Sequence, residues 1–168
     1  MTLSLYDISV PVFIRAFNNL SKNLAKARAH ADANGIAHDD LLGARLFPDM
    51  HPLTAQVQRA SDAAKFVPGR VADIKPPAME DNEKSFDELE ARIRATVDFL
   101  KSVPANAFDG REDAEVVLKF GGQPYPFTAR DYLLGFAIPN FYFHVTTAYA
   151  IMRHKGVPLG KMDFIGGR

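Results

Sequence analysis

The chain has 168 residues and no cysteine, and its 20 basic and 20 acidic side chains leave a formal net charge of zero. This length suits a single domain over residues 1–168, which buries about two-thirds of the surface that the unfolded chain would expose. The lack of cysteine excludes disulfides, thiolate metal ligands and cysteine nucleophiles. Because no block of like charge appears, the sequence argues against nucleic acid and against an acidic membrane surface as partners.

The sequence also bears on localisation. Residues 1–12 are short of positive charge and lack both a sustained apolar core and a small-residue cleavage site, which predicts that they are not a signal peptide. No apolar run approaches the roughly 20 residues of a membrane helix, because Pro139, Asn140 and His144 interrupt the richest stretch. We therefore expect a soluble, cytoplasmic protein.

Apolar side chains recur every three or four residues over 10–31, which is the spacing of an amphipathic helix. We expect Ser9 to cap this helix with Pro11 in its first turn, although a start nearer Ser4 with a kink at Pro11 stays open. Gly35, after an asparagine, predicts its end.

After a loop or short helical turn, a second stripe with the same spacing covers 50–67, with Asp49 as its expected cap and Pro68 as its expected end. Its remaining polar side chains are expected to form a solvated face; they are Gln56, Gln58, Arg59, Asp62 and Lys65. The unpatterned residues up to 82 indicate a long surface crossover, which lets two successive helices run in the same direction.

Ser85 and Glu88 have the spacing of a capping box and predict a third helix that closes at Pro104. The β-branched run 115–120, followed by two glycines, predicts a hairpin. Its second arm, 123–127, is expected at an edge because its two prolines cannot donate to a ladder.

Thr128 and Asp131 repeat the capping pattern and open a last helix that is expected to reach His154. Pro139 removes a backbone hydrogen bond in the middle of this helix and is expected to bend it. Four long helices with one small hairpin before the last predict an all-α four-helix bundle. Such bundles build their sites in the interior, from polar side chains on facing helices.

Asn140 and His144 lie one turn apart on the last helix, so that both side chains can reach one metal ion or one polar ligand. His-x-x-x-His is the common helical metal motif, and asparagine in its first position is a poor zinc ligand. The alternative is that Asn140 bonds the backbone freed by Pro139 and that His144 is an interior histidine with satisfied hydrogen bonds.

Two further residues are candidates for the same site. His51, next to the start of the second helix, would complete a three-residue site with Asn140 and His144, or else be a partly exposed first-turn histidine. Tyr149 would place a phenol near a cavity along the last helix, or else belong to the core.

Three segments resemble a known family. They are residues 48–58 (PDMHPLTAQVQ), residues 139–149 (PNFYFHVTTAY) and residues 153–160 (RHKGVPLG). Together they are similar to a bacterial domain of unknown function, a branch of the DinB/YfiT-like metalloenzyme superfamily. The resemblance covers nearly the whole chain and implies a four-helix bundle with up-down-down-up connectivity.

The resemblance also implies a metal site, made in typical superfamily members by one histidine on the second helix and a His-x-x-x-His pair on the last. His144 is then the counterpart of the last ligand, Asn140 that of the missing one, and His51 stands near the second-helix ligand. Two histidines and one amide bind a metal more weakly than three firm ligands. The site would therefore hold nickel or zinc loosely, or be a metal-free polar pocket.

The resemblance implies two alternative functions. Because superfamily relatives include thiol-dependent S-transferases and isomerases, the first is a small-molecule transferase. In it, His144 is a ligand or general base, Asn140 orients the substrate or a metal-bound water, and Tyr149 lies beside them. The second is a non-catalytic binding or stress-associated homodimer that keeps the pocket as a relic.

Overall fold

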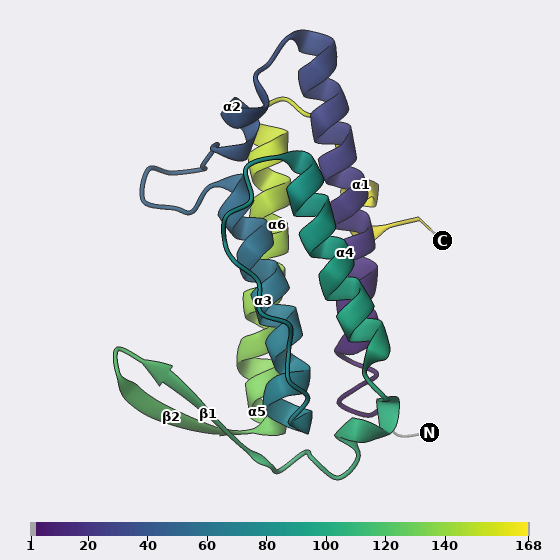
Figure 1. Ribbon diagram of the computed structural model, residues 1–168, viewed down its shortest axis with the longest axis vertical. Coiled ribbons are helices and arrows are strands. Elements are labelled where there is room, and N and C mark those ends of the chain that lie inside the picture. Colours follow the sequence, from purple (N-terminus) through teal and green to yellow (C-terminus); the bar gives the residue numbers. More distant parts are fainter. Residues whose placement is uncertain (1–2, 168) are drawn as a thin grey trace.

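The computed structural model describes residues 3–167 and is a four-helix bundle (Figure 1). The four long helices run up, down, down and up, as expected; they are α1 (Val10–Asn34), α3 (Leu53–Ala72), α4 (Phe86–Ser102) and α6 (Ile138–His154). Helix α3 packs against α4 and α6, and α1 packs against the same two helices. Among the described residues, no helix combines the length and the apolar character needed to cross a bilayer.

Shorter elements connect these helices or, in the case of α7, follow the last of them. They are α2 (His38–Leu42), a 3-10 turn (Ala105–Phe108), strands β1 (Glu115–Phe120) and β2 (Gln123–Thr128), α5 (Ala129–Tyr132) and α7 (Lys161–Ile165). The two strands pair antiparallel across Gly121 and Gly122, both of which adopt positive φ angles. The predicted hairpin before the last helix is therefore confirmed.

Helix α1 ends as predicted, because Gly35 adopts the left-handed conformation at φ 63° and its N–H donates to Ala31 O. Ser9 is the N-cap residue and Pro11 lies in the first turn, as predicted, but the Ser9 side chain makes no capping hydrogen bond. The Ser9 hydroxyl donates instead to Leu5 O at 2.6 Å. The segment before the helix is already turned back on itself, and this leaves the hydroxyl beside a carbonyl rather than beside the free N–H groups of the first turn.

The predicted bounds of the second long helix are also wrong. Helix α3 begins at Leu53 after Pro52, and it continues through Pro68 to Ala72. A proline in the last turn removes only one intrahelical hydrogen bond, and the burial of Val71 continues the apolar stripe past it. Asp73 at φ 56° ends the helix, and its N–H donates to Pro68 O.

The two predicted caps on the later helices are confirmed. Ser85 Oγ accepts a hydrogen bond from the Glu88 N–H at 3.2 Å, and Thr128 Oγ1 accepts one from the Asp131 N–H at 3.0 Å. Helices α4 and α5 therefore each begin with one of their free N–H groups satisfied by a side chain.

Pro139 predicts a bend in the last helix, but the helical geometry already changes about one turn before this residue. A π-helical turn, Leu133–Ala137, joins α5 to α6 without a break in the helical run, and Pro139, which has no N–H to donate, lies just after this turn. A π turn contains one extra residue and rotates the helix beyond it about the helix axis. The widened turn therefore sets the direction in which Asn140 faces.

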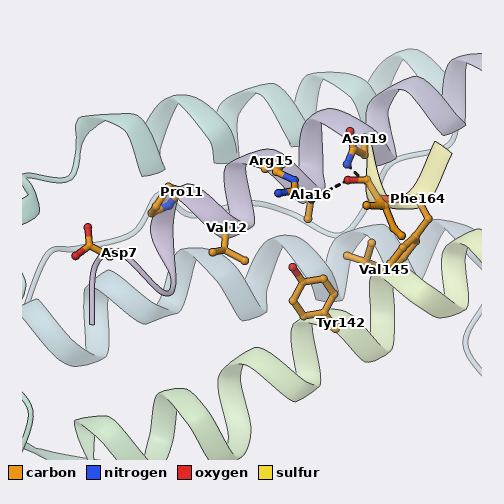
Figure 2. A pocket seen from close by; sticks show the side chains of 10 residues that line it. Asp7, Pro11, Val12, Arg15, Ala16, Asn19, Tyr142, Val145 and Phe164 are labelled. Carbon is orange, nitrogen blue, oxygen red and sulfur yellow. Dashed lines mark hydrogen bonds between the residues drawn. The ribbon is translucent and has the colours of Figure 1, made fainter. Parts of the chain in front are cut away.

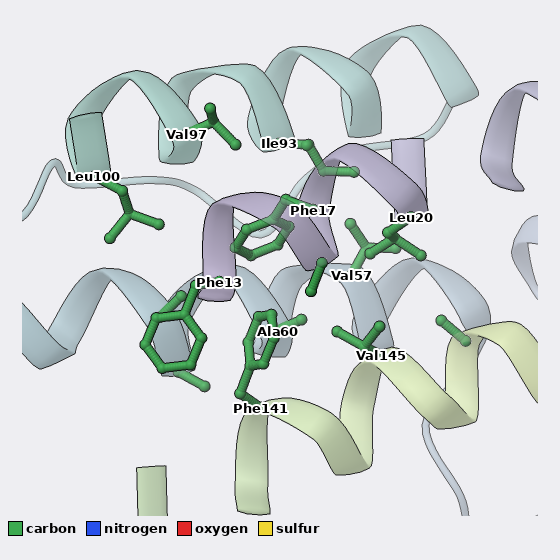
Figure 3. Packing of buried hydrophobic residues seen from close by; sticks show 14 of the residues in the cluster. Phe13, Phe17, Leu20, Val57, Ala60, Ile93, Val97, Leu100, Phe141 and Val145 are labelled. Carbon is green, nitrogen blue, oxygen red and sulfur yellow. The ribbon is translucent and has the colours of Figure 1, made fainter. Parts of the chain in front are cut away.

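Three phenylalanines join the two helices that run upward (Figure 3). The ring centroid of Phe141 on α6 lies 4.6 Å from that of Phe13 and 5.2 Å from that of Phe17, both on α1. All three side chains are fully buried. This contact fixes α6 against α1 and leaves the other side of α6 to face α3.

The crossover between α3 and α4 passes back along the bundle and is held by Arg92 of α4 (Figure 1). The Arg92 guanidinium, whose side chain is 1% exposed, lies 2.9 Å from carboxylate oxygens of both Asp81 and Glu83 in the crossover. Its other terminal nitrogen lies 3.1 Å from Asp62 Oδ1 on α3. One buried cation thus ties three segments together.

We expect Arg92→Leu to lower the free energy of unfolding by about 3 kcal/mol or more, because it leaves Glu83 nearly buried without its cation. The measurement is urea unfolding. The matched control is Arg28→Leu, which removes an exposed ion pair with Asp87 and should cost less than about 1 kcal/mol. Equal losses in the two variants would contradict a special role for the buried arginine.

Candidate functional site

A cavity of about 280 Å³ lies between α3 and the start of α6, and two of the predicted site residues line it. These two are Asn140, which is half-buried, and His144, which is 8% exposed. Other polar or charged side chains complete the lining; they are Arg59, Asp62 and Arg70 from α3 and Tyr132 from α5. The predicted pairing of Asn140 and His144 therefore faces a real cavity.

A hydrogen bond from α3 orients the His144 ring. His144 Nδ1 lies 2.8 Å from Gln56 Oε1, and the amide nitrogen of Gln56 donates to the His51 backbone oxygen at 3.0 Å. Because the Gln56 nitrogen is already a donor, its oxygen must be the acceptor, and we assign the ring proton to Nδ1. In the neutral ring Nε2 is then left with a lone pair.

His144 is uncharged at neutral pH. Burial, followed by the positive charge of Arg59 and by His51, lowers the pKa of His144 from 6.5 to about 4. The hydrogen bond to Gln56 agrees with the interior-histidine alternative, but that bond uses only one ring nitrogen. The other nitrogen has no hydrogen-bond partner among the described residues and is available as an acceptor.

Arg70 is held in place by two aromatic rings. Its guanidinium carbon lies 5.0 Å from the ring centroid of Phe66 and 5.4 Å from that of Tyr132, and its Nη1 donates to the Tyr132 hydroxyl at 2.8 Å. Burial raises the pKa of Tyr132, although Arg70 opposes this shift. The phenol therefore keeps its proton and can itself donate.

The structure does not bring Tyr149 to this cavity. Its ring packs edge-on against Phe164 of α7, with centroids 5.6 Å apart. Five residues along a helix turn the side chain by about 140°, so Tyr149 faces away from the side on which His144 lies. These contacts agree with the alternative in which Tyr149 belongs to the core, and not with a position beside His144.

His51 comes near His144 without a side-chain contact to it. Its side chain is exposed, and its contact with the site runs through its backbone oxygen and Gln56. Within residues 3–167, no three His, Cys, Asp or Glu side chains are grouped so as to hold a metal ion. Because two arginines also line the cavity, the residues present do not fit a tightly held divalent cation.

The prediction that the polar side chains of the second helix form a solvated face is wrong in part. Gln56, Gln58 and Lys65 are all buried. The signal for Gln56 was present in the sequence, since it lies three residues after Leu53 and so falls on the buried stripe. No sequence pattern marks Arg59 and Arg70 as cavity residues, because arginine on a helix surface is ordinary.

A second cavity of about 410 Å³ lies on the other side of α6, between α1 and α7 (Figure 2). Tyr142 points into it from α6, and burial raises the pKa of this phenol. The polar groups of α1 at its rim hold α7: Arg15 donates to Ile165 O at 3.0 Å and Asn19 donates to Phe164 O at 3.1 Å. We therefore interpret this second cavity as part of the contact between α1 and α7 rather than as a ligand site.

The fold is that of a DinB-like helical bundle. A crystal structure of a DinB family member from Shewanella denitrificans superposes with a TM-score of 0.92 at 34% sequence identity, covering 98% of this chain and 93% of that chain. The chain belongs to the family described as Domain of unknown function (DUF1993), whose model matches residues 5–165. The search of curated proteins finds no match.

We expect the stability of the protein to fall as the pH falls from 6.5 towards 4, and His144 to account for part of the loss. The pKa of His144 is lower in the folded chain, so the unfolded chain binds more protons in this window. Between pH 7 and pH 4.5, wild type should lose roughly 2 kcal/mol more than His144→Gln. Urea unfolding at both pH values measures this difference, and equal losses would contradict a lowered pKa.

Proposed function

We propose that the protein binds a small molecule in the cavity between α3 and α6, where His144 Nε2 accepts a hydrogen bond from it. The observation that carries the proposal is the arrangement of the ring, because Gln56 occupies Nδ1 while the side chain lines the cavity. Nε2 has no hydrogen-bond partner among the described residues and is not one of their fully buried unpaired atoms, so a ligand hydroxyl, amine or thiol can reach it and donate to its lone pair. Asn140, one turn away, would offer a second polar contact.

The chemistry of His144 limits the enzymatic form of this proposal. A base with a pKa of about 4 removes a proton from a thiol of pKa about 8.5 only at a cost of roughly 6 kcal/mol. For a thiol-dependent transferase, the arginines would have to make the thiolate, since nearby cations lower a thiol pKa. His144 would then position the ligand rather than act as a base. Ligand binding is therefore better supported than catalysis.

The proposal is tested by NMR with 15N-labelled protein and a set of small alcohols, amines and thiols. We expect binders to shift the side-chain amide signals of Gln56 and Asn140. His144→Leu should weaken the same binders about tenfold or more, because it removes the ring nitrogen that accepts a hydrogen bond in the cavity.

Tyr142→Phe is the matched control. Tyr142 lines the second cavity, between α1 and α7, so this change should leave binding in the cavity between α3 and α6 unchanged. Shifts gathered around Tyr142, or binding that His144→Leu does not weaken, would contradict the proposal. Zinc and nickel are tested in addition, by thermal unfolding of the wild type and of His144→Gln. A rise in melting temperature with either metal that disappears in His144→Gln would favour the metal-dependent alternative.

The homodimer stays a prediction, and exposed aromatic side chains support it. Phe143 on α6 is 55% exposed and Phe47, in the loop before α3, is 63% exposed. A groove beside Phe143 is lined mainly by apolar atoms of α6 and Leu46. Sedimentation velocity at micromolar concentration should show a dimer that Phe143→Ser dissociates, whereas a monomeric wild type would contradict this alternative.

A further inference from the structure

Two arginines without carboxylate partners face the same cavity. Arg59 and Arg70 are eleven residues apart on α3, which returns the side chain to within about 20° of the same direction, and both line the cavity. Within residues 3–167, neither guanidinium lies within 4.0 Å of a carboxylate, in contrast to Arg92 and Arg28. Cations left unpaired at a cavity wall favour an anion there.

The Arg70 side chain is preorganised to bind such an anion. A guanidinium carries five N–H donors in a planar fork, and in Arg70 the described hydrogen bond to Tyr132 uses one terminal nitrogen. Phe66 and Tyr132 flank the guanidinium at 5.0 and 5.4 Å, which restricts the long side chain before any ligand arrives. Less conformational entropy is then lost on binding.

The acidic side chain among the described lining residues does not cancel these charges. Asp62 Oδ1 lies 2.8 Å from the Lys65 ammonium and 3.1 Å from the Arg92 guanidinium, both of which are buried. Asp62 is therefore already paired with two cations outside the cavity lining. The positive charge of Arg59 and Arg70 is left to act on a ligand that enters.

We propose that the ligand of this cavity carries an oxyanion, a carboxylate or a phosphate, that Arg70 and Arg59 bind. The inference rests on the proposed function and names the chemistry of its ligand. Tyr132 accepts a hydrogen bond from Arg70, so its own O–H can donate to the same anion. The neutral end of the ligand, a hydroxyl or amine, would then face His144 and Asn140.

Two matched pairs of probes test the charge and its source. Lactate against lactamide tests a carboxylate, and glycerol 3-phosphate against glycerol tests a phosphate. Each is titrated into the full-length protein and followed by NMR at the cavity residues, at low and at high sodium chloride. We expect at least one anion to bind about tenfold or more tighter than its neutral partner and to weaken at high salt.

Variants assign the preference to the arginines. Arg70→Gln should remove most of the tenfold difference, and Arg70→Lys should restore only part of it, because an ammonium lacks the planar fork. Arg59→Gln, at an exposed position, is a second variant that should fold and should reduce the preference as well. Arg28→Gln, on the other side of the bundle, is the matched control and should leave it unchanged.

The outcomes separate the two proposals. If charged and neutral probes bind this cavity equally, or if Arg70→Gln and Arg59→Gln keep the anion preference, the anion inference is overturned and the small-molecule site stands. If no probe shifts the cavity residues, both proposals fail. If one anion of the pairs binds and the other does not, the anion inference is supported and its source is identified.

Discussion

The charge of Arg92 is buried where two parallel helices and the chain that connects them meet. Parallel neighbours need a long connection, and a polar segment such as 73–85 brings little apolar surface with which to hold itself in place. Arg92 supplies the missing attachment by meeting Asp81 and Glu83 in the crossover and Asp62 on α3. Burial raises the pKa of Glu83, but the hydrogen bonds from Arg92 and Gln58 outweigh it and lower the pKa below its usual value.

This network reaches the candidate site through Asp62. Without Arg92 and Lys65, the Asp62 carboxylate would be an uncompensated negative charge on the cavity wall, and it would attract the guanidinium groups of Arg59 and Arg70 or a metal cation. With both cations bound to it, the cavity keeps a positive character. The same residues that hold the crossover in place therefore help to set which ligands the cavity can accept.

The Asn140 and His144 pair is supported by a polar side chain on the facing helix. Gln56 of α3 bonds the ring of His144 directly, and its other end is fixed by the His51 backbone. The side chain of the second long helix that contacts the His144 ring is thus an amide, whereas the side chain of the predicted partner His51 is exposed. The π turn before α6 then places Asn140 at the cavity, with no acidic or histidine ligand grouped beside it in the part of the chain that the structure describes.

The sequence by itself determined the four helices, the hairpin and the caps at Ser85 and Thr128, because periodicity and capping are local properties of the chain. The connectivity followed from the family resemblance, and the long crossover alone only allowed it. The sequence also placed Asn140 and His144 together, since residues four apart share a helix face. Only the tertiary structure decided the ends of α3, the position of Tyr149 and the partners of His144. These depend on which helix faces which, and on how burial and neighbouring charges act across the interface between α3 and α6, where residues far apart in sequence meet.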